Sequence, residues 1–247
     1  MFPRLSVFDV IKLFFRALFT LLVVAVFVVL FWRMSSSRVP KDLLTLSPNA
    51  ILLEACDTYG DGLLKLTQEQ NSITRNEENY GYFAVSSAVF VPKAKQLQLL
   101  IRYNDSTLEA LEKDYALDFL PESDKDWYDV TLLLAIDKTP ENTEDNLASA
   151  PESVELVRVK ASEVAAREHS GRHSYRKFIF DGIDFDGTLL AVYADFYYIG
   201  DLAYESEDFD VYTDKAYGTL CLYAFTEASI NRESPLSTED KAALGLD

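Results

Sequence analysis

The chain has 247 residues, a formal net charge of −17 and 49% hydrophobic residues. That much apolar material can bury a core and offset the entropy of ordering the chain, which excludes a disordered polymer. Only two cysteines occur, Cys56 and Cys221, so the chain is not a disulfide-rich miniprotein. Such an acidic chain does not hold a nucleic-acid backbone by charge, and we expect no nucleic-acid partner. The length suits one domain with an appendage, or two small domains.

The charge is unevenly distributed along the chain. The first 38 residues contain five basic residues and a single acid, Asp9. From residue 39 onward, 18 basic and 39 acidic residues give a net charge of −21. The sequence therefore joins a basic, apolar N-terminus to a body that is more acidic than the average suggests.

An uncharged run of 16 residues, 17–32, is flanked by Arg16 and Arg33. Such a run covers about 24 Å as a helix, and snorkelling arginines extend it toward the roughly 30 Å of a bilayer core. We predict a transmembrane helix over residues 11–33, with Trp32 at the interface. A cleaved signal peptide is the alternative, but the run ends in Phe31, Trp32 and Arg33, which are unlike a cleavage site. An uncleaved signal anchor is therefore favoured.

The charges that flank this helix do not fix its orientation. Three basic residues precede it and three follow it, so the positive-inside rule alone does not choose an orientation. The positive charge of the free α-amino group slightly favours a cytoplasmic N-terminus. We expect residues 1–10 to form a short cytoplasmic segment in a single-pass protein of the cell membrane, with the C-terminal domain extracytoplasmic. An inward-facing domain is the alternative topology.

Several segments of the chain lack a strand pattern. Residues 34–50 are punctuated by Ser and Pro and are typical of a linker. Residues 51–79 predict a helical or irregular lead-in, which Gly60 and Gly62 interrupt. Residues 226–247 form a tail in which Ser237 would cap a short helix. Residues 106–115 and 161–169 predict helical turns.

Seven strands are predicted by alternating apolar residues between residues 80 and 225. The hairpin 80–104 is expected to have one buried face, with Leu97 and Leu99 inward and Gln96 and Gln98 outward. Irregular spacing of strands and helices favours an antiparallel, immunoglobulin-like β-sandwich over a parallel sheet, although the Cys–Trp–Cys spacing of antibody domains is absent. The predicted strands are 80–91, 95–104, 127–136, 153–160, 176–182, 188–200 and 218–225.

Residues 57–68 partly match a calcium-binding EF-hand loop. Asp57, Asp61, Gly62 and Leu64 stand at positions 1, 5, 6 and 8, but Gln68 replaces the bidentate Glu at position 12. Without that two-oxygen ligand, a surface turn broken by glycine is favoured.

Ten acidic residues lie between Lys177 and Lys215 without an intervening basic residue. If the loops at 181–187 and 201–214 met, their carboxylates would suit calcium. A solvated acidic rim is the favoured interpretation, because no spacing fixes a coordination geometry. The ten residues are Asp181, Asp184, Asp186, Asp195, Asp201, Glu205, Glu207, Asp208, Asp210 and Asp214.

His169 and His173 are the only histidines in the chain. Their spacing suits a metal pair on a helix, but Gly171 argues against a helix and the neighbouring cations would repel a metal. We predict a surface loop and one basic patch able to contact an anionic surface or partner. The neighbouring cations are Arg167, Arg172, Arg176 and Lys177.

No pattern of nucleophilic catalysis occurs, because the chain lacks a G-x-S-x-G elbow and a Gly-rich phosphate loop. Cys221 is expected to be a small buried strand residue, and a Cys56–Cys221 disulfide is the less favoured alternative. Asn104 opens an Asn-Asp-Ser glycosylation pattern, which matters only in a eukaryotic secretory pathway. We assign no catalytic residue, no cofactor-binding residue and no metal ligand, and we expect no cofactor.

The basic N-terminus, the single anchor helix and three stretches, NYGYFAVSSAVFVP, LLIRYNDSTLEALEKDY and YGTLCLYAF, together resemble uncharacterised single-pass membrane proteins of Gram-positive bacteria. The resemblance covers most of the chain and implies an extracytoplasmic β-rich domain, but no activity and no site residues.

We expect a non-enzymatic binding or scaffolding module of the cell envelope. It would contact the lipid bilayer through residues 11–33 and a protein partner through a body that holds all 14 tyrosines. The alternative is a calcium-dependent adhesion or ligand-binding module that uses the acidic loops. An enzyme would need a cleft around Asp184, Asp186, Asp201 or Asp208.

Overall fold

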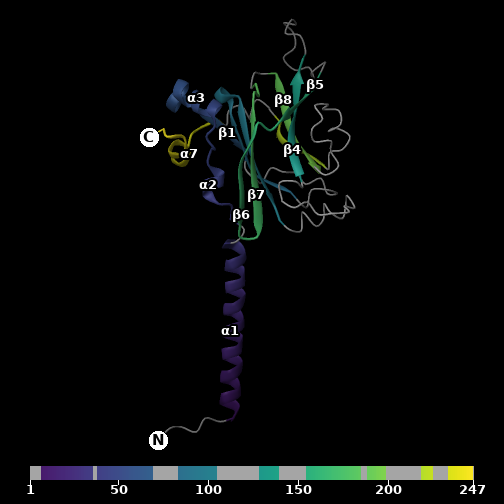
Figure 1. Cartoon of the computed structure of the whole chain (residues 1–247). Coiled ribbons are helices and arrows are strands. Elements are labelled where there is room, and N and C mark those ends of the chain that lie inside the picture. The colour runs from purple at the N-terminus through teal and green to yellow at the C-terminus, as the bar shows by residue number, and fades with distance from the viewer. Residues whose placement is uncertain are drawn as a thin grey trace, which may run out of the picture. The chain divides into compact units, whose positions relative to one another are not determined.

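The computed structural model describes residues 7–35, 38–68, 83–104, 128–138, 154–184, 188–198, 218–224 and 233–246 (Figure 1). The predicted helical turn at 106–115 lies outside these residues. The N-terminal helix and the strand-rich body belong to separate compact units.

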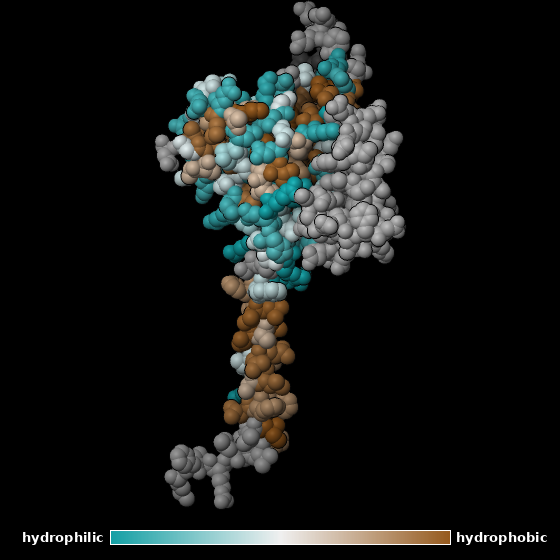
Figure 2. All heavy atoms as spheres, in the orientation of Figure 1, coloured by the Kyte–Doolittle hydropathy of each residue, from teal (hydrophilic) through white to brown (hydrophobic). Residues whose placement is uncertain are grey.

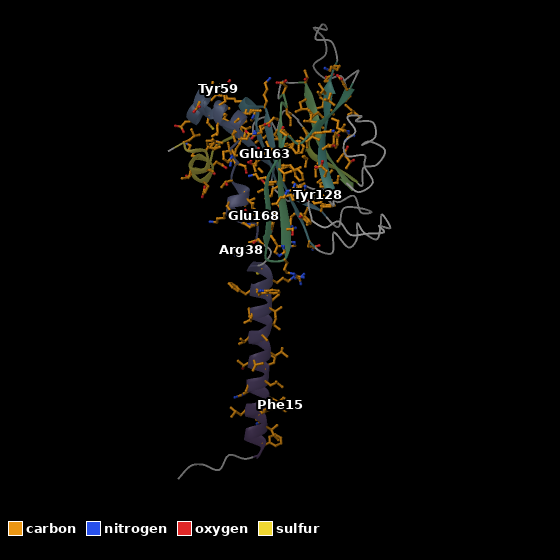
Figure 3. The ribbon with its side chains drawn as sticks, in the orientation of Figure 1. Phe15, Arg38, Tyr59, Tyr128, Glu163 and Glu168 are labelled. Carbon is orange, nitrogen blue, oxygen red and sulfur yellow. The ribbon has the colours of Figure 1, made fainter. Side chains whose placement is uncertain are left out.

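The N-terminal unit contains one long helix, α1 (Val7–Ser35). Residues Ile11–Met34 of this helix are long and apolar enough to cross a membrane, since 24 residues rise about 36 Å. Its apolar side chains are exposed and give the helix a mostly brown surface (Figure 2), and Phe15 projects outward from it (Figure 3). The apolar helix predicted over residues 11–33 is therefore present.

The body contains two antiparallel sheets. The six-stranded sheet has the order β10-β1-β2-β3-β7-β6, and the four-stranded sheet has the order β5-β4-β8-β9. All seven predicted strands are confirmed as β2, β3, β4, β5, β7, β8 and β9. The strands are β1 (Leu64–Gln68), β2 (Ala84–Val91), β3 (Gln96–Tyr103), β4 (Tyr128–Asp137), β5 (Val154–Lys160), β6 (Glu163–Ser170), β7 (His173–Asp181), β8 (Leu189–Tyr198), β9 (Gly218–Ala224) and β10 (Ser234–Pro235).

The main hydrophobic core lies between the two sheets. It takes alternate residues from the longer strands, because successive side chains of a strand point to opposite faces. The six-stranded sheet contributes Leu97, Leu99, Ile101, Phe178 and Phe180, among others. The four-stranded sheet contributes Tyr128, Val130, Leu132, Val192 and Leu220, among others.

The predicted β2–β3 hairpin forms, but it is buried on both faces. Phe90 pairs with Leu97 and Val91 with Gln96, across a short 3-10 turn, η3 (Pro92–Ala94), that ends at Lys95 in a left-handed conformation. Gln96 and Gln98, expected to face solvent, are buried. The reason is that a further layer of chain covers the outer face of this sheet.

Residues 161–169 do not form the predicted helical turn. They contain β6, an edge strand beside β7, which the chain reaches through a turn at Gly171 with φ of 65°. Strand pairing outweighs the helix propensity of Ala165, Ala166 and their charged neighbours. Glu163 and Glu168 are both exposed and lie on this edge strand (Figure 3).

The covering layer comes from both ends of the body. It comprises α2 (Lys41–Leu44), α3 (Ala50–Tyr59), the 3-10 turn η1 (Gly60–Gly62) and α7 (Thr238–Leu244), and Figure 1 shows α2, α3 and α7 on one side of the body, near β1. Ser237 and Asp240 form a capping box at the start of α7, which confirms the predicted helix. A second core joins α3 and α7 to the sheet through Leu46, Leu52, Val89, Leu236 and Leu244, among others.

We call residues 39–49 the N-terminal strap. Residues 34–50 were expected to be a linker, yet Leu43 and Leu46 of the strap are buried. Leu43 packs against Leu100 and Tyr175 of the sheet, with Val39 at the edge of the same cluster. The chain therefore joins the folded body only a few residues after α1 ends.

Candidate functional site

A network of buried carboxamides holds the N-terminal strap to β3. The Gln98 side chain accepts a hydrogen bond from the Ser47 backbone N–H (2.8 Å) and donates one to the Ser47 carbonyl oxygen (2.8 Å). Gln96 donates to Asn49 Oδ1 (2.9 Å) and to Asp181 Oδ1 (2.8 Å). Gln98 therefore pairs with the strap backbone as a residue of a neighbouring strand would, and Gln96 binds the Asn49 side chain of the strap.

Asp240 connects the C-terminal helix to the N-terminal strap. Its Oδ1 accepts from the Leu46 backbone N–H (2.9 Å), and its Oδ2 accepts from Lys65 and from Ser237 Oγ (2.7 Å). Burial raises the pKa of this carboxyl, but hydrogen bonds from Lys65, Ser237 and Leu46 outweigh that effect, so the pKa of Asp240 lies below its ordinary value. One carboxylate thus joins three segments that are distant in sequence.

Lys177 is buried beneath the same strap. Its ammonium donates to the Thr45 carbonyl oxygen, and its aliphatic stem lines a small pocket together with Leu43 and Leu100. Burial lowers the pKa of Lys177 from 10.5 to about 8, although the negative charge of Asp240 acts in the opposite direction. Lys177 was predicted to lie in a surface basic patch, and that prediction is wrong.

Arg176 was predicted for the same surface patch and is also buried. It points toward the core between the sheets, where its guanidinium lies over the rings of Tyr128 (4.5 Å) and Phe178 (5.0 Å). Its Nη1 donates to the Tyr128 carbonyl oxygen (2.6 Å). Both errors have one cause. Arg176 and Lys177 are successive residues and point to opposite faces of β7, and both faces of this strand are covered.

The two histidines lie on adjacent strands rather than in one loop. His169 on β6 contacts Ser174 Oγ through Nδ1 (3.1 Å), and His173 on β7 lies edge-on to Tyr175. The predicted surface loop is therefore wrong for these residues, since only a two-residue turn separates the strands.

A buried ion pair lies on the outer face of the four-stranded sheet. Arg158 and Asp195 form this pair, with side chains 6% and 3% exposed. The same Arg158 nitrogen donates to Thr131 Oγ1 (2.9 Å), and Thr219 Oγ1 donates to the carboxylate (2.6 Å). Four polar residues from the four strands of this sheet therefore form one connected cluster, which sequence analysis did not anticipate.

The segment that resembles an EF-hand loop ends in a strand. Asp57 lies within α3, Asp61 pairs with Lys241, and β1 begins at Leu64. An EF-hand needs a second helix after its loop, and Gly60, with φ of 51°, ends α3 as a glycine-broken turn would. The favoured interpretation of this segment is confirmed.

The acidic residues that the structure describes between Lys177 and Lys215 do not converge. Asp181 accepts from Gln96, Asp184 pairs with Lys95, and Asp195 pairs with Arg158. Within the described ranges, no three His, Cys, Asp or Glu side chains form a group suited to a metal. The other acids of this set, Asp186, Asp201, Glu205, Glu207, Asp208, Asp210 and Asp214, lie outside the described residues.

The two cysteines are free thiols, with Cys56 buried and Cys221 exposed. Cys221 lies on the outward face of β9, which corrects the expectation that it is buried. Burial raises the pKa of Cys56, with the negative charge of Asp57 adding to the effect, and partial burial raises the pKa of Cys221. Neither thiol is therefore activated as a nucleophile.

Among the strands that the structure describes, β5 presents the most exposed large apolar side chains. It pairs with β4 alone among the described strands, so it is an edge strand. Val154 is 48% exposed and Leu156 is 61% exposed, whereas Val157 and Val159 pack against the core. An edge strand with exposed apolar residues offers backbone and side-chain contacts to another chain.

Comparison with known proteins gave no match to any family model, to any curated protein or to any solved structure.

Proposed function

We propose that this protein is a single-pass protein of the cell membrane whose extracytoplasmic domain is a non-enzymatic binding or scaffolding module of the envelope. The apolar helix Ile11–Met34 supports the anchor, and the resemblance to single-pass proteins of Gram-positive bacteria supports the envelope. A non-enzymatic role is supported by the buried charged side chains of the described residues, such as Lys177, Asp195 and Asp240, which are held by structural partners.

The body is proposed to be an immunoglobulin-like β-sandwich. Its strand orders β2-β3-β7-β6 and β5-β4-β8-β9 correspond to the immunoglobulin orders A-B-E-D and C′-C-F-G, with β1 and β10 added at one edge. In a crystal structure of the full chain, we expect the two sheets to cross at about −30°. A crossing near 90° would contradict the proposal.

The proposal that the body binds a protein partner rests on the edge strand β5. We infer that the partner adds an extended segment beside β5 and covers Val154 and Leu156. Backbone hydrogen bonds would supply affinity, and the two apolar side chains would supply specificity. Lys160 is also exposed and ends the strand with a charge, which limits the pairing to a short segment.

Leu156→Lys tests this binding surface, because a lysine on an edge strand opposes strand addition. Leu53→Lys is the matched control, since Leu53 is 40% exposed but lies on α3. After crosslinking in native membranes, we expect the Leu156 variant to lose a partner that both the wild type and the control retain. A partner retained by the Leu156 variant, or lost equally from both variants, would contradict the surface.

The exposed thiol of Cys221 tests the orientation. A membrane-impermeant maleimide applied to intact cells should label the wild type and not Cys221→Ser, because Cys56 is buried. Labelling that requires cell lysis would place the body inside and overturn the extracytoplasmic proposal.

A further inference from the structure

The N-terminal strap is held by side chains rather than by a strand ladder. Gln98 binds both backbone groups of Ser47, and Lys177 binds the Thr45 carbonyl oxygen. Apart from the single turn of α2, residues 39–49 contain no helix or strand. Contacts of this kind separate one after another when a chain is pulled from one end, whereas a strand ladder that is pulled lengthwise must break several hydrogen bonds at once.

The C-terminal helix fastens the strap. Asp240 accepts from the Leu46 backbone N–H, and Leu46 shares the second core with Leu236 and Leu244. The contacts that position Asp240 come from Lys65 and Ser237, and neither of these residues belongs to the strap. Removal of α7 would therefore leave the Leu46 N–H without its partner and uncover one side of the Leu46 side chain.

The main core does not depend on the strap. Among the described residues, the core between the sheets takes its members from the strands and from the adjoining residues 83, 161 and 183. Leu43 and Leu46 belong to two smaller clusters on the outer face of the six-stranded sheet. The strap can therefore leave the sheet while the two-sheet core stays folded.

We propose that the strap is a releasable section of the membrane tether, with α7 as its latch. When the latch opens, residues 39–49 leave the sheet and become a linker of at most about 36–40 Å. The tether between α1 and the body is then longer by this linker, while the body stays anchored. This inference relies on the membrane insertion of α1 proposed above and does not depend on the identity of the partner.

Asp240→Ala in the full chain, reconstituted in nanodiscs, is the test variant, because alanine removes both carboxylate oxygens and therefore the acceptor of the Leu46 N–H. Lys241→Ala is the matched control, because Lys241 lies on the same helix but pairs with the exposed carboxylate of Asp61. Hydrogen exchange should accelerate at least tenfold at Leu46 and Ser47 in the Asp240 variant, with β3 and β7 unchanged. Gln98→Ala, which frees the strap from the sheet side, should give the same pattern.

Energy transfer from a dye on Cys221 to labelled lipid headgroups measures the extension. We expect lower transfer efficiency in the Asp240 and Gln98 variants and no change in the Lys241 control. Unchanged strap exchange, or exchange that rises equally in β3, would overturn the latch. Fast strap exchange with unchanged energy transfer would overturn the extension. Both results are distinct from a failure of the partner proposal, which the Leu156 variant tests.

Discussion

Replacement of Asp195 by asparagine is expected to destabilise the body strongly. The change removes the charge that compensates Arg158, whose side chain is only 6% exposed. Removal of one partner from a buried ion pair costs about 3–5 kcal/mol, because the remaining charge stays desolvated. The asparagine keeps one oxygen that can accept from Arg158 or Thr219, so we expect a loss of about 3 kcal/mol. That is a large part of the 5–15 kcal/mol typical of a folded domain.

Urea denaturation of the detergent-solubilised chain, followed by near-UV circular dichroism, measures this loss. Glu155→Gln is the control, because the Lys138–Glu155 pair (3.1 Å) is half-exposed and should contribute no more than about 0.5 kcal/mol. Replacement of both buried partners, by Arg158→Met with Asp195→Leu, should recover at least half of the loss. A loss below about 1 kcal/mol for Asp195→Asn would refute the reasoning that burial makes this pair important.

Three further predictions concern single side chains. Leu132→Ala should cost about 2–5 kcal/mol in the same urea assay, whereas Leu156→Ala on the neighbouring strand should stay within about 0.5 kcal/mol, because only Leu132 is buried. Equal losses would contradict the assignment of the core. The stabilisation of the docked strap by Asp240 should be complete above the ordinary carboxyl pKa of 3.8 and should fall as the pH drops toward the lower pKa of the folded state. Hydrogen exchange of the strap should therefore accelerate in acid in the wild type but not in Asp240→Asn. An equal acceleration of strap exchange in acid in both proteins would contradict this role of Asp240. The pKa of Lys177 is about 8 in the folded state and 10.5 in the unfolded state, so the unfolded state binds more protons between these two pH values. The free energy of unfolding should therefore rise with pH across this window, and the rise should be absent in Lys177→Met. A rise in stability of the same size in Lys177→Met would refute the assignment of the rise to Lys177.

The strands of the two sheets could be predicted from sequence because their core-facing residues alternate. Leu97, Leu99 and Ile101 face the core between the sheets, and their spacing is visible without a structure. β6 was mistaken for a helical turn because Glu, Ala and Arg favour helices, while the pairing with β7 that determines its conformation is a tertiary contact.

The polar clusters could not be predicted from sequence. Gln98 looks like a solvent-facing residue of an alternating strand, and only the position of Ser47, 51 residues earlier, makes it a buried binding group. Likewise, Arg158 and Asp195 are 37 residues apart and become neighbours only through the order of strands in the four-stranded sheet. No local pattern encodes either contact.

The junction between the two ends of the body has a consequence for biosynthesis. Leu46 is among the first residues of the body to be synthesised, and Leu236 and Leu244, against which it packs, are among the last. The part of the strap around Leu46 therefore waits through translation of nearly the entire body before its buried surface is complete. A chain that stops before residue 236 leaves Leu46 incompletely covered, so stable docking of the strap requires the segment that carries Leu236 and Leu244.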